Sequence, residues 1–247
     1  MEADRRIPKA KQQPGVSVIT CTNRHSYLKN LFHNFTRQLY PMKELIIVVN
    51  NDGIPLEPYL RMAKKWKTVR VFRAPGAWSL GACINFAAKK AKYAYIAKFD
   101  DDDYYAPYYL TASLQVMHRS RADVIGKRAH YMYLNGSKTL ILRFPRDENR
   151  IASRLPGATL VFRKAVIERV PFPERNVGED DVFCLRCRKK GFKVYSGEKS
   201  NFVAIRRKNS LGHTWIISEQ ELIAHHRTIP NVRNFKKFVQ HKPKGVL

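Results

Sequence analysis

The sequence lacks an apolar run of the ~18 residues that a helix needs to cross a bilayer. Its first fifteen residues are polar and have no apolar centre of the kind found in secretory signals. Both absences predict a cytoplasmic protein without an integral membrane span. They leave open a peripheral attachment to a membrane or a particle.

Cysteine is also scarce, with four residues among 247. Cys184 and Cys187 form a CxxC pair, but neither a second such pair nor a nearby pair of histidines completes a zinc pattern. We therefore expect these two, together with Cys21 and Cys83, to be reduced and buried, as free cysteines usually are. A redox or metal role is the alternative.

Acidic residues are few: 20 Asp and Glu stand against 46 Lys and Arg, and the formal net charge is +26. Such an excess predicts an anionic partner, whether phosphates, acidic glycans, nucleic acid or an anionic surface, and charge alone does not choose among them. A nucleic-acid-binding protein is thus one hypothesis. It is the weaker one, because the sequence has no zinc-finger pattern, RRM signature or Walker loop.

The first half of the chain alternates between short apolar runs and amphipathic segments. The runs predict strands and the amphipathic segments predict helices. The expected strands are 16–20, 45–49, 69–72 and 93–97, and the expected helices are 28–39, 57–65, 79–90 and a segment from about 107. Four strand–helix repeats favour an α/β fold with a mostly parallel sheet, in which ligands bind at the carboxyl ends of the strands.

The second half is less regular. We expect strands over 124–134 and 139–144 with a turn at Asn135-Gly136, further strands over 159–162 and 192–195, and a helix over 181–190. The chain then divides into a basic, polar tail (1–15), one α/β domain (16–217), and a C-terminal helix with a basic tail (218–247).

The sharpest feature is a run of four aspartates, Asp100 to Asp103, directly after the fourth expected strand. Adjacent carboxylates repel one another by about 1 kcal/mol per close pair even in water, and this destabilises the fold unless a cation lies among them. Mg²⁺ and Mn²⁺ prefer such oxygen ligands and leave positions open for phosphate. The run therefore predicts a divalent-metal site, with an acidic turn that caps the next helix as the alternative.

Two later segments also carry candidate chemistry. Gly178-Glu179-Asp180-Asp181 precedes a helix, so it is either an N-cap or the source of a general base for an acceptor hydroxyl. The segment 206–215 combines Arg206 and Arg207 with His213 and is suited to grip phosphates or complete a metal shell. A solvated histidine is the alternative there.

Together these motifs resemble glycosyltransferase family 2. The matching stretches, in chain order, are 16–24, 44–51, the Gly-x-x-x-Asn of Gly81 to Asn85, 95–102 ending in DxD, Glu179-Asp180, and 206–215. The resemblance covers roughly 16–215. It implies the GT-A fold, a Rossmann-like, mostly parallel central sheet flanked by helices, with a smaller antiparallel portion on the acceptor side.

The resemblance also implies a role for each matching residue. The residues that would line the nucleotide-sugar pocket are Thr20, Thr22, Arg24, Asn51, Asp52, Asn85, Asp100 and Asp101. Among them, Asn51 or Asp52 would contact the base. Asp102 would bind the Mn²⁺ or Mg²⁺ that bridges the diphosphate, joined by His213, and Asp180 would be the base of an inverting displacement.

Two departures from the family pattern refine this reading. Family members often carry an Asp-Asp pair after the second strand, where this chain has Asn50-Asn51-Asp52, so the base is not fixed, with UDP or TDP the expected nucleotides. The Gln-x-x-Arg-Trp motif of processive synthases is absent. We therefore expect transfer of one or a few sugars to a glycan or other hydroxyl acceptor, which an excess of basic residues allows to be anionic. The resemblance favours surface polysaccharide synthesis at a cell envelope or spore surface, and a GT-A-like scaffold without catalysis is the alternative.

Overall fold

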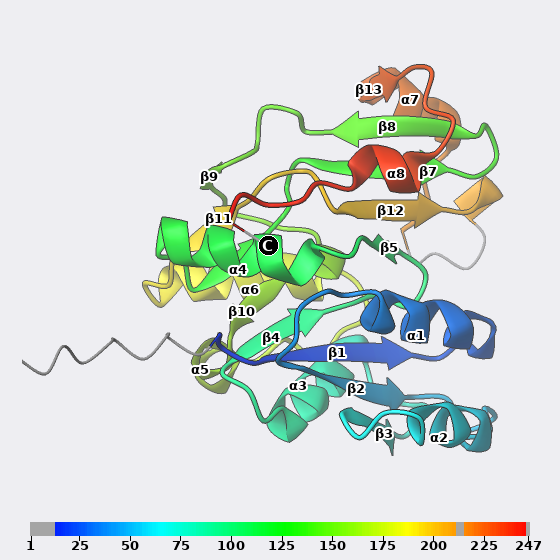
Figure 1. Ribbon diagram of the computed structural model, residues 1–247, viewed down its shortest axis with the longest axis vertical. Coiled ribbons are helices and arrows are strands. Elements are labelled where there is room, and N and C mark those ends of the chain that lie inside the picture. The colour runs from blue at the N-terminus through cyan, green and yellow to red at the C-terminus, as the bar shows by residue number, and fades with distance from the viewer. Residues whose placement is uncertain (1–12, 211–214, 246–247) are drawn as a thin grey trace, which may run out of the picture.

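Two β-sheets organise the chain in the computed structural model, which describes residues 13–210 and 215–245 (Figure 1). The larger sheet has the order β3-β2-β1-β4-β10-β6-β11-β9. Its strands are β1 (Val16–Thr22), β2 (Lys43–Val49), β3 (Val69–Arg73), β4 (Tyr95–Lys98), β6 (Val124–Gly126), β9 (Arg150–Ile151), β10 (Val161–Arg163) and β11 (Val194–Ser196). All run in one direction except β9 and β10, so the expected, mostly parallel sheet is confirmed.

Helices cover both faces of the larger sheet because its central strands are apolar on both sides. Val18 belongs to the buried cluster that packs under one set of helices, and its neighbour Ile19 belongs to the cluster on the opposite face. The first set is α1 (Leu28–Thr36), α2 (Glu57–Ala63) and α4 (Tyr109–Ser120). The second set is α3 (Leu80–Lys90), α5 (Lys164–Arg169) and α6 (Glu179–Lys189).

The smaller sheet has the order β13-β8-β7-β12-β5, and only β12 and β7 pair in parallel. Its strands are β5 (Tyr104–Tyr105), β7 (His130–Leu134), β8 (Thr139–Arg143), β12 (Phe202–Arg206) and β13 (Arg227–Ile229). The turn expected at Asn135-Gly136 joins β7 and β8 and is confirmed. Short 3₁₀ segments occur at η1 (His25–Tyr27), η2 (Gly157–Thr159) and η3 (Lys208–Ser210).

The single strand expected over 124–134 is wrong, because this segment forms β6 in the larger sheet and β7 in the smaller one. Between them the backbone N–H groups of Lys127 and Arg128 donate to the side chains of Thr159 and Ser196, at 2.9 Å in both cases. Side-chain acceptors replace the ladder partners at this point, so the chain leaves one sheet and enters the other.

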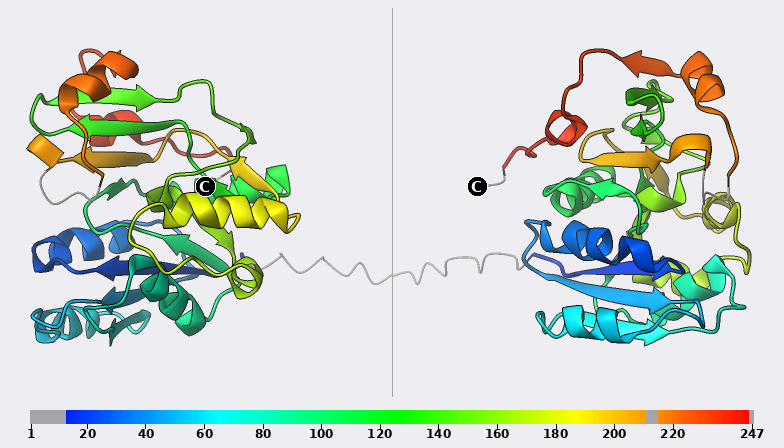
Figure 2. Two further views of the ribbon diagram at one scale, coloured as in Figure 1. Left: turned by 180° about the vertical axis from the view of Figure 1, so that it is seen from behind. Right: turned by 90° about the vertical axis from the view of Figure 1, so that its right-hand side faces the viewer.

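The C-terminal segment completes the smaller sheet. After α7 (Glu219–His225), β13 pairs with β8, and α8 (Phe235–Val239) follows. Val239 is buried in the apolar cluster of this sheet, and its carbonyl accepts the N–H of Asn201 at 2.8 Å. Figure 2 shows the orange α7 and β13 at the far end of the molecule from the cyan β3 and α2, with the red stretch running back toward the middle. The part of 218–247 that the structure describes is therefore packed against the protein.

The structure also bears on the cysteines and on the expected lack of a membrane span. Cys83, Cys184 and Cys187 are buried and Cys21 is partly buried, and all four are free thiols, as expected. Among the helices that the structure describes, none has the length and apolar character required to cross a membrane.

Candidate functional site

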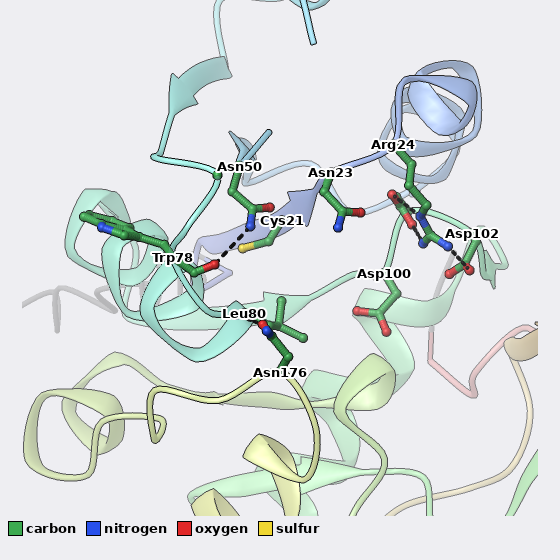
Figure 3. A pocket seen from close by; sticks show the side chains of 11 residues that line it. Cys21, Asn23, Arg24, Asn50, Trp78, Leu80, Asp100, Asp102 and Asn176 are labelled. Carbon is green, nitrogen blue, oxygen red and sulfur yellow. Dashed lines mark hydrogen bonds and ion pairs between the residues drawn. The ribbon is translucent and has the colours of Figure 1, made fainter. Parts of the chain in front are cut away.

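An open, polar cavity of about 370 Å³ lies at the carboxyl ends of β1, β2 and β4 (Figure 3). Its lining comes from these strand ends, from the loop after β3, and from the segment before α6. The lining residues are Cys21, Asn23, Arg24, Asn50, Gly76, Trp78, Leu80, Asp100, Asp101, Asp102 and Asn176. The convergence that parallel topology predicts is therefore present: three polar strand ends meet at one rim.

Arginines, not only metal ions, can supply the cation that the aspartate run needs. Asp101 is 3% exposed and accepts from the Thr22 hydroxyl at 2.6 Å and from the Arg24 guanidinium. Burial and the neighbouring charge of Asp102 raise the pKa of Asp101 to about 6, although Arg24 and Thr22 oppose the shift. Asp102 pairs with Arg24 at 3.1 Å and with Arg207 at 2.9 Å.

Asp103, the last aspartate of the run, forms hydrogen bonds that connect three elements of the fold. The Asp103 carboxylate accepts the N–H of Ile205 in β12 at 2.8 Å. Its backbone carbonyl accepts from the amides of Asn30 and Asn34 on α1, at 3.0 and 2.8 Å. Asp103 thus joins the end of β4 both to a helix of the larger sheet and to a strand of the smaller sheet.

A divalent ion fits this site only with help from a ligand. Among the described residues, no group of three His, Cys, Asp or Glu side chains could hold a metal ion. His213 lies outside the described residues. Mg²⁺ commonly binds through one or two carboxylates together with substrate phosphates, and Asp102, which lines the cavity, suits that mode.

The second acidic cluster begins α6, directly after Gly178, which takes a left-handed conformation (φ 70°). The Asp180 carboxylate accepts the N–H of Gly157 at 2.6 Å and that of Asp181 at 2.8 Å. Burial raises the pKa of Asp180 even though these hydrogen bonds and the charge of Lys98 oppose the shift. The carboxylate is therefore fixed in place and is a stronger base than an exposed aspartate.

Lys98 connects the two acidic clusters. It is 4% exposed and forms an ion pair with Asp100. Burial opposes its charge, but Asp100, Glu179 and Asp180 together raise the pKa of Lys98 above its ordinary value. The sequence reading missed Lys98, although a lysine inside the apolar run of β4, two residues before the aspartates, signals a buried charge partner.

Glu179 belongs to the expected acidic cluster, but the sequence predicted no role for it apart from that of Asp180. It is 6% exposed, and burial raises its pKa to about 7, with Lys98 opposing and Asp180 adding to the shift. A buried carboxylate with a pKa near neutrality, next to the expected base, is a common feature of catalytic sites.

Neither of the two residues expected to contact the base, Asn51 and Asp52, lines the cavity. Asn51 donates to the carbonyl of Asn23 at 3.1 Å, and Asp52 accepts the N–H of Gly76 at 3.1 Å, so both brace loops at the rim. Asn50 lines the cavity instead, with its amide 3.4 Å from the carbonyl of Trp78. Asn50 is the first polar residue after β2, which is the signal that could have identified it.

Of the three residues expected from the end of β1, only Arg24 lines the cavity. Thr22 is buried against Asp101 and acts through that contact. Thr20 is buried within β1 and is not among the lining residues.

The structure places Asn85 away from the cavity. Its side chain pairs with both backbone groups of Phe172, at 2.9 and 3.0 Å. One turn earlier on α3, a Cβ atom on Gly81 would lie 1.9 Å from the carbonyl oxygen of Pro173, so only glycine permits this approach. This face of α3 therefore holds the segment after Phe172 close to the helix. The segment leads to Asn176, which lines the cavity and whose side chain accepts the N–H of Leu80 at 2.8 Å.

We expect the free energy of unfolding to fall as the pH rises from 4.5 to about 7, in EDTA. The pKa of Glu179 is about 7 in the folded protein and 4.5 ordinarily, so in this range the folded state keeps a proton that the unfolded chain has lost. Stability present below pH 4.5 is therefore lost as the pH passes 7. In Glu179→Gln this decrease in the free energy of unfolding should be smaller by about 2–3 kcal/mol, because the amide does not titrate.

Urea unfolding at pH 5 and pH 8 measures the effect. Glu174→Gln, at an exposed position, is the matched control and should keep the wild-type dependence on pH. An unchanged pH dependence in Glu179→Gln would contradict the assignment of the buried, protonated carboxyl to Glu179.

Comparisons with known proteins agree with this geometry. The family described as "Glycosyl transferase family 2" matches residues 17–174. A relative from Escherichia coli, "O-antigen biosynthesis glycosyltransferase WbnJ", is 27% identical over 164 residues. The match covers 62% of this chain and 63% of that protein.

Two similar solved structures support the fold alone, because their sequence identities are low. The S. aureus protein TarS (residues 1–349), in complex with UDP-GlcNAc, has a TM-score of 0.62 at 18% identity, with 82% of this chain and 62% of that chain covered. The mannosyltransferase PcManGT from Pyrobaculum calidifontis, in complex with GDP-Man and Mn²⁺, has a TM-score of 0.63 at 14% identity, with 79% and 57% covered. The expected GT-A architecture is confirmed.

Proposed function

Because the chain belongs to glycosyltransferase family 2, we propose that it transfers a sugar from a nucleotide-diphosphate donor to a hydroxyl group of a glycan acceptor. One observation carries this proposal. The polar cavity at the ends of β1, β2 and β4 is lined by the first three aspartates of the run, and buried Lys98 links Asp100 to the candidate base Asp180. A site for a charged donor and a site for proton removal are thereby held in one electrostatic network.

The donor would lie with its nucleotide against the ends of β1 and β2. Asn50 offers the base an amide that can both donate and accept. We propose UDP or TDP as the nucleotide, as the resemblance to the family implies. Asp102 would hold a Mn²⁺ or Mg²⁺ ion together with the two phosphates. Such an ion, when bound, stabilises the negative charge that develops on the leaving diphosphate.

Asp180 would remove the proton from the attacking hydroxyl. The N–H groups of Gly157 and Asp181 orient its carboxylate, and its raised pKa brings it closer to the range in which a general base works well. A single base on the acceptor side supports direct displacement with inversion at the anomeric carbon. We infer surface polysaccharide as the product class, in line with the O-antigen relative.

The donor site is tested by thermal unfolding with UDP, TDP, GDP and CDP, each with Mn²⁺ and with EDTA. A ligand at 100 times its dissociation constant stabilises the fold by about 2.7 kcal/mol. For a chain of this size we expect the melting temperature to rise by about 5–10 °C with UDP or TDP and Mn²⁺. The rise should be much smaller in EDTA.

The pattern of stabilisation among the four nucleotides tests both the donor site and the identity of the base. A rise with GDP or CDP alone would keep the donor site and overturn the proposed base. No rise with any nucleotide, in a sample that melts cooperatively, would favour a GT-A-like scaffold without catalysis.

A further inference from the structure

Three arginines gather on the smaller sheet with almost no acidic counterpart. We define the arginine cluster as Arg128, between β6 and β7, Arg143 at the end of β8, and Arg206 at the end of β12. In the part of the chain that the structure describes, Arg143 and Arg206 form no ion pair with a carboxylate, and Arg128 has only Asp147, at 3.9 Å.

The three charges act against one another. Burial, followed by the charges of Arg128 and Arg206, lowers the pKa of Arg143 to about 10, so the side chain is still charged at neutral pH. Burial and the charge of Arg207 likewise lower the pKa of Arg206, with Asp102 partly opposing. The cluster therefore carries electrostatic strain that a bound anion would relieve.

Aromatic rings hold the guanidinium groups in position. Trp215 lies 4.8 Å from the guanidinium carbon of Arg143 and 5.0 Å from that of Arg206. Phe144 lies 3.8 Å from the guanidinium of Arg128 and 5.0 Å from that of Arg143. Because stacked guanidiniums keep their N–H edges available, this arrangement is preorganised for an oxyanion.

One buried donor in the cluster lacks an acceptor. The Nε atom of Arg206 is buried and has no hydrogen-bond partner among the described residues. Other donors are already used: Arg206 donates to the Ser210 hydroxyl at 2.8 Å and to the carbonyl of Trp215, and the Nε of Arg143 donates to His226 at 3.2 Å. An unsatisfied buried N–H costs stability, and an anion with several acceptor oxygens is one way to recover it.

The cluster adjoins the donor cavity. Arg207, the next residue after Arg206, forms the ion pair with Asp102 that was described above. The charge of Asp102, which lines the cavity, also opposes the lowering of the pKa of Arg206, so the cluster lies within electrostatic reach of the cavity.

We propose that the arginine cluster binds an oxyanion of the sugar acceptor, either a phosphate ester or a carboxylate, beside the hydroxyl that receives the transferred sugar. This inference rests on the proposed function. Planar guanidiniums form paired hydrogen bonds with both kinds of oxyanion. A small cluster stacked on aromatic rings suits one compact anion better than the extended backbone of a nucleic acid, which is contacted by many exposed cations.

The test compares three small probes in the presence of UDP and Mn²⁺: glucose 1-phosphate, glucuronate and uncharged methyl glucoside. Calorimetry at constant ionic strength gives the affinities, and a fluorescence change that is lost in Trp215→Phe reports binding at the cluster itself. We expect one or both anionic probes to bind and methyl glucoside to bind much more weakly. Arg143→Gln should lower the affinity for the anionic probe about tenfold, equivalent to about 1.4 kcal/mol.

Arg61→Gln, at an exposed position of α2, is the matched control for the loss of one positive charge and should bind the probe like the wild type. Arg143→Lys keeps the positive charge but not the planar guanidinium, so its affinity for the probe should lie between those of the wild type and Arg143→Gln. If Arg143→Gln does not fold, Arg128→Gln carries the same test. The probe that responds to the substitution identifies the oxyanion.

Failure of this proposal is separable from failure of the donor site. Anionic probes that bind Arg143→Gln as tightly as the wild type, or that do not bind at all while UDP with Mn²⁺ still stabilises the protein, would overturn the acceptor site alone. Loss of nucleotide stabilisation with retained, Arg143-dependent probe binding would overturn the donor proposal and leave the anion site standing.

Discussion

Asp180→Asn is expected to reduce sugar transfer by about 10²–10⁴-fold, the usual contribution of a general base, while the affinity for the donor nucleotide is unchanged. The amide cannot accept a proton from the attacking hydroxyl. It also keeps only one acceptor oxygen for the two N–H groups of Gly157 and Asp181 that now hold the carboxylate. Release of the nucleotide diphosphate measures transfer, and thermal stabilisation by the nucleotide measures donor binding.

The neighbouring carboxylates make this test specific. Asp181→Asn is the matched control: its side chain is 43% exposed and faces Arg154 at 3.7 Å, so transfer should change little. Glu179→Gln separates the two buried carboxyls. If Glu179→Gln lost transfer to this extent and Asp180→Asn did not, the base would be Glu179, whose pKa of about 7 also suits that role.

Asp102→Asn is expected to lower transfer by about 10²–10³-fold, on the scale seen when a group that stabilises transition-state charge is removed. In contrast to Asp180→Asn, it should also abolish the Mn²⁺-dependent part of nucleotide stabilisation, because Asp102 is the carboxylate proposed to share the ion with the phosphates. The measurements are turnover with saturating donor and melting temperatures with nucleotide in Mn²⁺ and in EDTA.

The substitution also leaves Arg24 and Arg207 with less negative charge between them, since both pair with Asp102. The melting temperature without ligand therefore has to be measured for the variant. Asp123→Asn, which loses a surface pair with Arg163 at 3.6 Å, is the matched control and should retain both activity and the Mn²⁺ response. Full Mn²⁺-dependent stabilisation of Asp102→Asn would remove Asp102 from the ion site.

The first half of the fold was predictable because local and global signals agree there. Residues 45–49 are all apolar, and β2 is indeed buried on both faces between α1 and α2 on one side and α3 on the other. Polar residues at the ends of such strands converge for topological reasons, which is why the sequence alone predicts the aspartate run at the ligand-binding edge of the sheet.

Partners of individual side chains were not predictable in the same way. Asn85 and Asp52 have the residue types of ligand contacts, yet their hydrogen-bonding groups are occupied by the backbones of Phe172 and Gly76. Sequence spacing fixes the strand end or helix face on which a residue lies, but loop geometry decides what it meets. The division of 124–134 between two sheets has the same origin, because it depends on acceptors supplied by Thr159 and Ser196 far along the chain.

Asp103 couples local opening of the two sheets. Its bonds to Ile205 in β12 and to Asn30 and Asn34 on α1 tie both sheets to the residue that follows the proposed ion ligand. Neither sheet can open locally at this point without breaking contacts of the other, so we expect them to behave as one cooperative unit in amide hydrogen exchange. Protection gained when the cavity is filled should therefore extend along β12.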